Sequence, residues 1–271
     1  MNSFLVSELR LALGVEPIDA LLGGRVARPL QVELEGSGHR FTRHESGRYS
    51  LARWLGAAQA GPTSPLDLRI FDRRRGYVPR RLRVHLPPVA EVASGRRIRR
   101  PALYPGVAWD LVGNATALRS RVLRDGAPVR WACVEARRPG AGEDDIVIRT
   151  RADDRGEFLL VLASDTIELS ELEPIPGEPI GSKLMIDLEL DLRIHGPASA
   201  PVPPPASEGP LDPLWDLPLD ELELPADPVD PEDLDPVAAG HTIPDGWVPL
   251  VEHRIRFALG HTISDQSSFV I

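Results

Sequence analysis

Residues 128–134 read Pro-Val-Arg-Trp-Ala-Cys-Val and residues 155–160 read Arg-Gly-Glu-Phe-Leu-Leu, and these two runs decide the fold. A proline opens an alternation of apolar and polar residues, and a turn with glycine opens a second apolar run. The same pattern occurs earlier, in residues 29–34 (Pro-Leu-Gln-Val-Glu-Leu) and 46–51 (Ser-Gly-Arg-Tyr-Ser-Leu). Alternation with a period of two is typical of strands that bury one face. The repeat therefore predicts two similar β domains.

Other alternating runs support this interpretation. They are Leu66–Phe71 and Arg81–Leu86 in the first repeat, and Ile146–Thr150 and Leu184–Ile194 in the second. The last run alternates over eleven residues, with acidic side chains on the solvated face. Residues 4–13 fit a short helix or a first strand equally well, because the run is short. We predict an all-β protein with two tandem β-sandwich domains.

Changes in composition predict the domain boundaries. Residues 1–88 form the first sandwich with a short N-terminal segment, 89–111 a surface linker and 112–196 the second sandwich. Residues 197–240 form a Pro-rich acidic linker, with 12 prolines between Pro197 and Pro236. Residues 241–271 form a C-terminal strand and tail, because Val251–Phe257 alternates again. The acidic segment has two interpretations, an extended linker or a strap over a basic surface.

Charge and cysteine content limit the class of protein. Net charge is +8 over residues 1–110, −5 over 111–197 and −12 over 198–271, which gives −9 in total. The oppositely charged ends attract each other or partners of opposite charge. Cys133 is the single cysteine, so no disulfide forms within the chain. We expect a cytoplasmic protein that does not enter a membrane, because neither a signal peptide nor a long apolar run is present.

The turns of the repeat resemble those of a known family. Gly126-Ala127-Pro128-Val129 followed by Asp154-Arg155-Gly156-Glu157-Phe158 resembles the carboxypeptidase regulatory-like, or transthyretin-like, Ig-like β-sandwich family. The resemblance covers about residues 15–88 and 112–195. It implies a fold and an accessory role, and it brings no catalytic residues. The chain is also similar to accessory proteins found with phage-tail-like contractile injection particles.

Motifs for catalysis, metal binding and cofactor binding are absent from the sequence. It contains no zinc-peptidase His-Glu-x-x-His, no Gly-x-Ser-x-Gly and no phosphate-binding Gly-x-x-x-x-Gly-Lys-Ser/Thr. His39, His44 and Glu45 fit surface turns better than a metal site. We therefore expect no enzymatic activity, no metal and no cofactor.

Two groups of residues are candidates for partner binding. The first is an arginine-rich surface, for which nucleic-acid binding is the less favoured interpretation because aromatic residues are few. Its other interpretations are a solvated face and docking on acidic protein, including the chain's own residues 208–235. The second group is the C-terminal strand, which is expected to complete a sheet either in this chain or in a neighbour, and which would recruit partners by strand addition. The candidates are Arg73, Arg74, Arg75, Arg96, Arg97, Arg99, Arg100, Val251, His253, Ile255 and Phe257.

These features favour a non-enzymatic structural or adaptor protein. It would connect or cap protein subunits of an oligomeric complex assembled in the cytoplasm, such as a contractile injection particle. The alternative is a β-sandwich that binds carbohydrate or another small ligand. Five tryptophans are available for a sugar platform, but they are scattered along the chain. Anchoring of a core or an interface explains them better.

Overall fold

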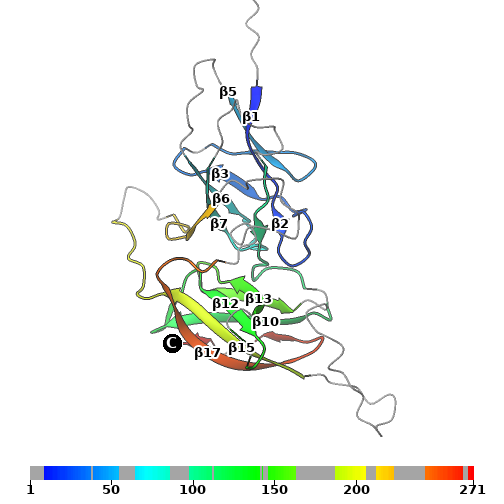
Figure 1. Cartoon of the computed structure of the whole chain (residues 1–271), viewed down its shortest axis with the longest axis vertical. Helices are drawn as coiled ribbons and strands as arrows, with labels where there is room; N and C mark the ends of the chain where they lie inside the picture. Colours follow the sequence, from blue (N-terminus) through cyan, green and yellow to red (C-terminus); the bar gives the residue numbers. More distant parts are fainter. Residues whose placement is uncertain are drawn as a thin grey trace, which may run out of the picture. The chain divides into compact units, whose positions relative to one another are not determined.

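The computed structural model describes residues 9–37, 39–54, 65–85, 98–111, 113–140, 142, 146–162, 187–205, 212–222, 242–264 and 268–271 (Figure 1). The regular elements in these residues are all β-strands, and no helix occurs among them. The protein is therefore all-β, as the alternating runs predict. No helix in the described residues is long and apolar enough to cross a bilayer.

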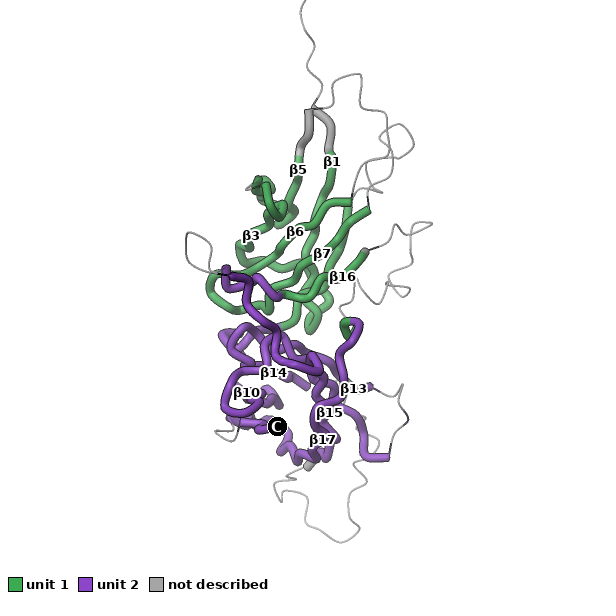
Figure 2. Tube along the Cα trace, turned by 90° about the vertical axis from the view of Figure 1, so that its left-hand side faces the viewer, with its two compact units in different colours: residues 1–104, 217–244 green, residues 105–216, 245–271 purple. Residues whose placement is uncertain are grey.

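The chain forms two compact units, each made from two separate parts of the sequence (Figure 2). Unit 1 comprises residues 1–104 and 217–244, and unit 2 comprises residues 105–216 and 245–271. The chain thus leaves unit 1, builds most of unit 2, returns to unit 1 and ends in unit 2.

Unit 1 contains two four-stranded sheets. Its strands are β1 (Leu9–Val15), β2 (Ile18–Asp19), β3 (Gln31–Leu34), β4 (Thr42–Arg43), β5 (Tyr49–Trp54), β6 (Leu66–Phe71), β7 (Arg80–Val84), β8 (Ile98–Arg99), β9 (Ala102–Leu103) and β16 (Leu219–Leu222). One sheet has the order β4-β5-β1-β8 and the other β16-β7-β6-β3, while β2 pairs with β9.

The sequence of β6 and β7 explains how they pack. Leu68 and Ile70 of β6 and Leu82 and Val84 of β7 are completely buried. The residues between them point to the other face, as the pleat of a strand requires. Arg83 lies there opposite Asp67, and its Nε and Nη2 donate to that carboxylate at 2.8 Å each. This hydrogen bond holds the pKa of Asp67 below its ordinary value.

Unit 2 is a β-sandwich. Its strands are β10 (Thr116–Arg124), β11 (Ala127–Pro128), β12 (Cys133–Arg137), β13 (Ile146–Arg151), β14 (Glu157–Leu162), β15 (Asp187–Pro197), β17 (Trp247–Ala258), β18 (Thr262–Ser264) and β19 (Phe269–Val270). One sheet has the order β13-β12-β15-β17. In the other, β10 pairs with β11, β14, β18 and β19.

The core of unit 2 contains residues from both sheets. Phe158 and Leu160 of β14 pack in one cluster with Val134 of β12, Leu192 of β15 and Phe257 of β17, and all five are completely buried. In β15 the buried leucines alternate with Asp191 and Arg193, so the period of two correctly predicts its buried face, whereas β12 is buried on both faces and β14 beyond Glu157 is too. The sheets meet through these side chains.

The predicted turns of the second repeat carry the expected glycines. Asp125 and Gly126 have φ of 51° and 79°, and the hairpin of β10 and β11 closes through them. Positive φ at both central residues is the geometry that favours the sequence Asp-Gly in tight hairpins. Gly156 has φ of 71°, and its N–H bonds to the Asp153 carbonyl at 3.0 Å.

Strand pairing differs from the predicted organisation in two places, and it gives the C-terminal strand, whose partner the sequence left open, a neighbour in the same chain. Strands β8 and β9 lie within residues 89–111, the predicted surface linker, and pair in parallel with β1 and β2. Strand β16 lies within the Pro-rich acidic segment and pairs in parallel with β7. Strand β17 pairs with β15 of the same chain over eleven residue pairs, and Figure 1 shows the two side by side. For residues 4–13 the sequence allowed either a short helix or a strand. The described part of this run belongs to strand β1 (Leu9–Val15), so it is a strand.

Candidate functional site

A groove of about 570 Å³ lies in unit 2, beside the C-terminal strand. We call it the C-terminal groove. It is bordered by β17 on one side and by β10, β18 and β19 on the other. Its apolar lining is made by Leu118, Val251, Ile255, Ile263, Phe269 and Val270, and its polar lining by His253, Arg254, Arg256 and Ser268.

The apolar lining is a continuation of the core of unit 2. Leu118 belongs to the buried cluster, and Val251, Ile255, Ile263 and Phe269 are partly buried hydrophobic residues packed against it. Removing partly exposed apolar surface from water is favourable, by about 25 cal/mol for each Å². The groove is therefore a place where the core is open and can accept further apolar groups.

An aromatic contact shapes one wall of the groove. The rings of His253 and Phe269 lie at 77° to each other with their centres 5.7 Å apart, and Phe269 also lies 6.0 Å from Phe158. Edge-to-face contacts of this kind favour one ring orientation. The imidazole of His253 is exposed, so a polar group is presented next to an apolar surface.

The rim of the groove carries two arginines held by carboxylates of β15. Arg254 donates to both oxygens of Asp191, at 2.7 and 3.0 Å, and Arg256 donates to Glu189 at 2.7 and 3.2 Å. The hydrogen bond from Arg254 holds the pKa of Asp191 below its ordinary value. The side chains of Arg254 and Arg256 remain more than half exposed, at 57% and 65%.

Strand β17 stands at the edge of its sheet. It pairs with β15, and no strand in the described residues pairs with its other side. Edge strands present backbone donors and acceptors that can pair with another extended segment. The apolar groove and this edge lie on the same strand.

Three of the predicted partner-binding residues, Val251, His253 and Ile255, line this groove together. The prediction for Phe257 needs correction, because its side chain is completely buried in the core of unit 2. Sequence reasoning missed Leu118, Ile263 and Phe269. They come from other strands, and only the short apolar run Phe269-Val270-Ile271 at the end of the sequence hints at Phe269.

The predicted arginine surface is divided among different environments. Arg73 and Arg74 are exposed in the turn after β6, where Arg73 Nε donates to Gln31 at 3.0 Å. Arg75 follows them with φ of 59°. Arg99 is only 5% exposed and donates to the carbonyl of His85 at 3.3 Å, so it is not available to a partner. Arg100 joins an ion-pair cluster around Glu16 in unit 1. Arg96 and Arg97 lie outside the described residues.

Part of the acidic segment docks on an arginine of unit 1. Asp220 of β16 receives hydrogen bonds from Arg80 at 2.9 and 3.3 Å, and the two side chains are 3% and 2% exposed. Arg80 also donates to the Ala102 carbonyl at 2.8 Å. Glu221 pairs with His85 at 2.6 Å nearer the surface. For residues 219–222, the docking of an acidic strap on the chain's own arginines is therefore the interpretation that the contacts support.

A second acidic residue of the segment lies in unit 2. Asp216 accepts hydrogen bonds from Arg130 Nε and Nη2, both at 2.6 Å, and from Trp131 Nε1 at 2.8 Å. Arg130 lies over the rings of Trp131 and Trp215. Because Trp131 is only 2% exposed, it anchors this segment and presents no platform to a sugar.

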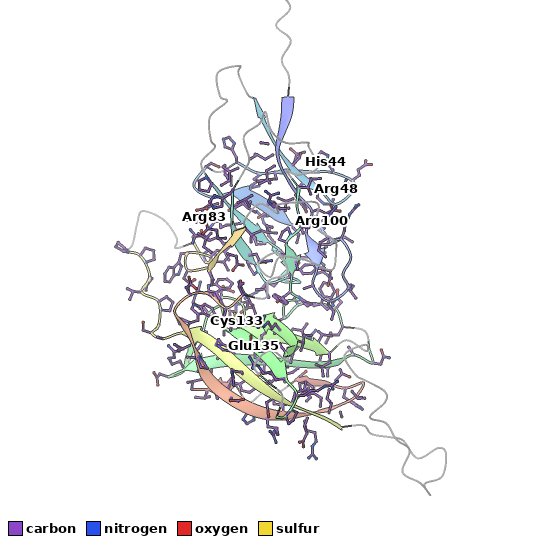
Figure 3. All side chains as sticks on the ribbon, viewed as in Figure 1. His44, Arg48, Arg83, Arg100, Cys133 and Glu135 are labelled. Carbon is purple, nitrogen blue, oxygen red and sulfur yellow. The ribbon has the colours of Figure 1, made fainter. Side chains whose placement is uncertain are left out.

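A buried polar cluster occupies the sheet of β12, β13 and β15. The Glu135 carboxylate is completely buried and lies 2.8 Å from Arg137, 2.7 Å from Arg149 and 3.3 Å from His195 (Figure 3). Burial opposes ionisation of Glu135, but its hydrogen bonds and the positive charges lower its pKa to about 2. Cys133 is buried on the same strand. No group of three or more potential metal ligands occurs in the part of the chain that the structure describes.

The chain has little similarity to known proteins. No protein-family model and no curated protein matches it. Among solved structures, it is similar to the Bacillus anthracis TIE protein, with 11% identity and a TM-score of 0.25 over 97% of this chain. The chain spans about a third of that protein, 34% of its length. It is also similar to a DUF3823 family protein from Bacteroides ovatus, with 10% identity and a TM-score of 0.22, over 68% of this chain and 90% of that one. This similarity is too low to assign a family or an activity.

Proposed function

We propose that the protein is a non-enzymatic adaptor that connects or caps protein subunits of a larger assembly. The C-terminal groove binds an extended segment of a partner subunit, which adds to the free side of β17. The observation that carries this proposal is the combination of an open apolar core and an edge strand at one place. Strand addition of this kind derives affinity from backbone hydrogen bonds and specificity from pockets for alternate side chains.

The chain already uses strand addition within itself. Strand β16 adds in parallel to β7, and β18 and β19 add in parallel to β10, each from a distant part of the sequence. Short added strands can thus be held by these sheets. A partner segment on β17 extends the same principle to a second molecule.

The rim indicates the chemistry of the segment. Side chains of an added strand that point into the groove meet Val251, Ile255 and Phe269, so they are apolar. Side chains on the other face lie across from Arg254 and Arg256, which are more than half exposed. Opposite charges on neighbouring strands attract. We therefore infer a partner segment in which apolar and acidic residues alternate.

The host assembly is a separate part of the proposal. The turns of the second repeat resemble those of carboxypeptidase regulatory-like domains, and this resemblance is the reason for proposing an accessory role. As host we propose a phage-tail-like contractile injection particle, an assembly built inside the cell. Sedimentation of large particles from a native lysate, followed by mass spectrometry, tests this part. Co-sedimentation with tube or sheath proteins supports it, and a chain that stays in the supernatant contradicts it.

The groove itself is tested with a photo-crosslinking amino acid at His253 in the full chain. We expect crosslinks to one subunit, within a segment of alternating apolar and acidic residues. The variant Val270→Asp puts a charge in the groove wall and should remove the crosslinks. The matched control is Val202→Asp, because Val270 and Val202 are both exposed valines of unit 2, at 69% and 84%. Equal crosslinking by both variants contradicts the proposal.

A small apolar ligand is the second candidate for this groove. Its volume of about 570 Å³ lies in the range of small-molecule sites. Native mass spectrometry of the purified chain distinguishes the two functions. A bound small molecule that Val270→Asp displaces and Val202→Asp retains favours ligand binding over an adaptor function.

A further inference from the structure

Three arginines converge on one buried carboxylate in unit 1. The Glu16 side chain is 2% exposed, and Arg25, Arg48 and Arg100 approach it through their Nε atoms. Arg25 contacts Oε1, while Arg48 and Arg100 lie 3.4 and 3.2 Å from Oε2. We call this group the Glu16 cluster. Figure 3 labels Arg48 and Arg100, which lie near each other in it.

The cluster is assembled from four separate parts of unit 1. Glu16 lies between β1 and β2, and its N–H bonds to the Arg99 carbonyl at 2.8 Å, which places Arg100 beside it. Arg48 ends the turn between β4 and β5, where Gly47 has φ of 79°. Arg25 lies in the bridge that pairs it with Ile18. Tertiary structure therefore brings together three positive charges that are distant in the sequence.

The cluster has more positive charge than its carboxylate needs. Burial raises the pKa of Glu16, but the hydrogen bond from Arg100 and the charges of the three arginines hold it below its ordinary value. Glu16 is therefore ionised at neutral pH and neutralises one guanidinium. Two positive charges remain, on side chains that are 49%, 42% and 59% exposed. Like charges held together at a surface favour a bound anion.

We propose that the Glu16 cluster is a binding site for the carboxylates of an acidic peptide segment from a partner protein. The planar guanidinium group matches a carboxylate by two parallel hydrogen bonds. In the same unit, Arg80 and Arg83 already hold the carboxylates of Asp220 and Asp67. This site does not depend on the C-terminal groove, because all of its residues belong to unit 1.

Nucleic acid fits the cluster less well. Binding of single strands combines basic residues with aromatic rings on which bases stack. Phe41 and Tyr49, which are aromatic residues of the neighbouring β3–β5 segment, are only 7% and 3% exposed. The net charge of −9 also repels a long polyanion. A short acidic peptide can pair with the positive charges of the cluster, and it lacks the long negative backbone that the net charge of the chain repels.

The test is fluorescence anisotropy of fluorescein-labelled hexaglutamate with the full chain at low salt. Hexaglutamate has no apolar residues for the C-terminal groove, and R254Q/R256Q, which removes the two exposed arginines at the rim of that groove, should bind it within about twofold of the wild type. The variant R48Q/R100Q leaves Glu16 paired with Arg25 and removes the two excess charges. We expect its binding to be about tenfold weaker. Arg100→Gln alone removes the most exposed of the three and should weaken binding about threefold with the least effect on folding.

The matched control is R73Q/R74Q, which removes two exposed arginines elsewhere in unit 1. It should bind hexaglutamate within about twofold of the wild type. The proposal is overturned if this control loses as much affinity as R48Q/R100Q, or if Arg100→Gln binds like the wild type. If a labelled dT6 oligonucleotide binds more strongly than hexaglutamate, the proposal of an acidic peptide as the ligand is overturned in favour of nucleic acid.

Discussion

The ion pair between Asp220 and Arg80 holds the acidic segment on the sheet of unit 1, and Asp220→Ala tests its contribution. The two side chains are 3% and 2% exposed, with Oδ2 2.9 Å from Arg80 Nη2. Removing one partner of a buried pair while the other stays buried costs about 3–5 kcal/mol. Releasing β16 from the sheet costs the variant less than keeping Arg80 buried without its partner.

The cost of release follows from what β16 and its neighbour bury. Leu217 is 2% exposed next to the strand, and burying a leucine side chain stabilises by about 1.5–3 kcal/mol. Releasing β16 exposes this side chain and lets water reach Arg80. We therefore expect the docked state to lose about 2 kcal/mol, because the less costly route dominates.

Hydrogen exchange measures this loss at the backbone. Strand β16 pairs with residues 81–84 of β7, so protected amides in both strands report on its docking. A loss of about 2 kcal/mol corresponds to exchange that is about thirtyfold faster. Glu221→Ala is the matched control, because it removes the same charge from the same strand. Glu221 is 57% exposed and pairs with a His85 that is 43% exposed, so its loss should cost less than about 1 kcal/mol.

A double variant completes the experiment. R80M/D220L replaces the ion pair with apolar side chains and should restore most of the protection that Asp220→Ala removes. Equal exchange in Asp220→Ala and Glu221→Ala would refute the reasoning, because it would mean that the buried pair does not hold β16 on the sheet.

Three further predictions concern unit 2. Phe257→Ala should lower the free energy of unfolding of this unit by about 3–5 kcal/mol in urea titrations, since the ring is completely buried; a loss below about 1 kcal/mol contradicts its place in the core. The folded pKa of Glu135, about 2, lies below its ordinary value of 4.5. The ionised Glu135 therefore stabilises the fold above pH 4.5, and this stabilisation is lost as the pH falls toward 2. Acidification over this range should lower the free energy of unfolding of Glu135→Gln by about 3 kcal/mol less than that of the wild type. Parallel pH dependence of unfolding in both proteins would show that this carboxylate is not stabilised. Gly156→Ala should be more destabilising in thermal melts than Gly126→Ala, although both residues have positive φ. An added Cβ meets the Val122 carbonyl oxygen at 2.5 Å at Gly156 and nothing within 4 Å at Gly126, and equal melting temperatures would contradict this difference.

Local pattern was sufficient to predict the strands with a clear period of two. Leu68, Ile70, Leu82 and Val84 are buried as their alternation predicts, and β15 continues to residue 197. The turn glycines Gly126 and Gly156 have positive φ, which glycine adopts without steric cost. These features depend on neighbours in the sequence, so they are visible in it.

The candidate sites depend on contacts that the sequence does not display. The alternation of residues 251–257 predicts that Val251 and Ile255 share one face of a strand, but Leu118 and Phe269 complete the groove from other strands. Glu16 meets Arg25, Arg48 and Arg100 only because four loops converge in unit 1. No spacing in the sequence marks either site.

The sequence by itself determined that the protein is all-β, which faces of its clear strands are buried and where its glycine turns lie. Only the tertiary structure decided that part of the acidic segment is a strand of unit 1, that β17 completes the sheet of unit 2, and that Phe257 and Arg99 are buried. The physical reason is that side-chain alternation is a property of each strand alone. The choice of strand partner depends instead on backbone hydrogen bonds, which any sequence can make, and on ion pairs such as that of Arg80 with Asp220, whose residues are 140 positions apart.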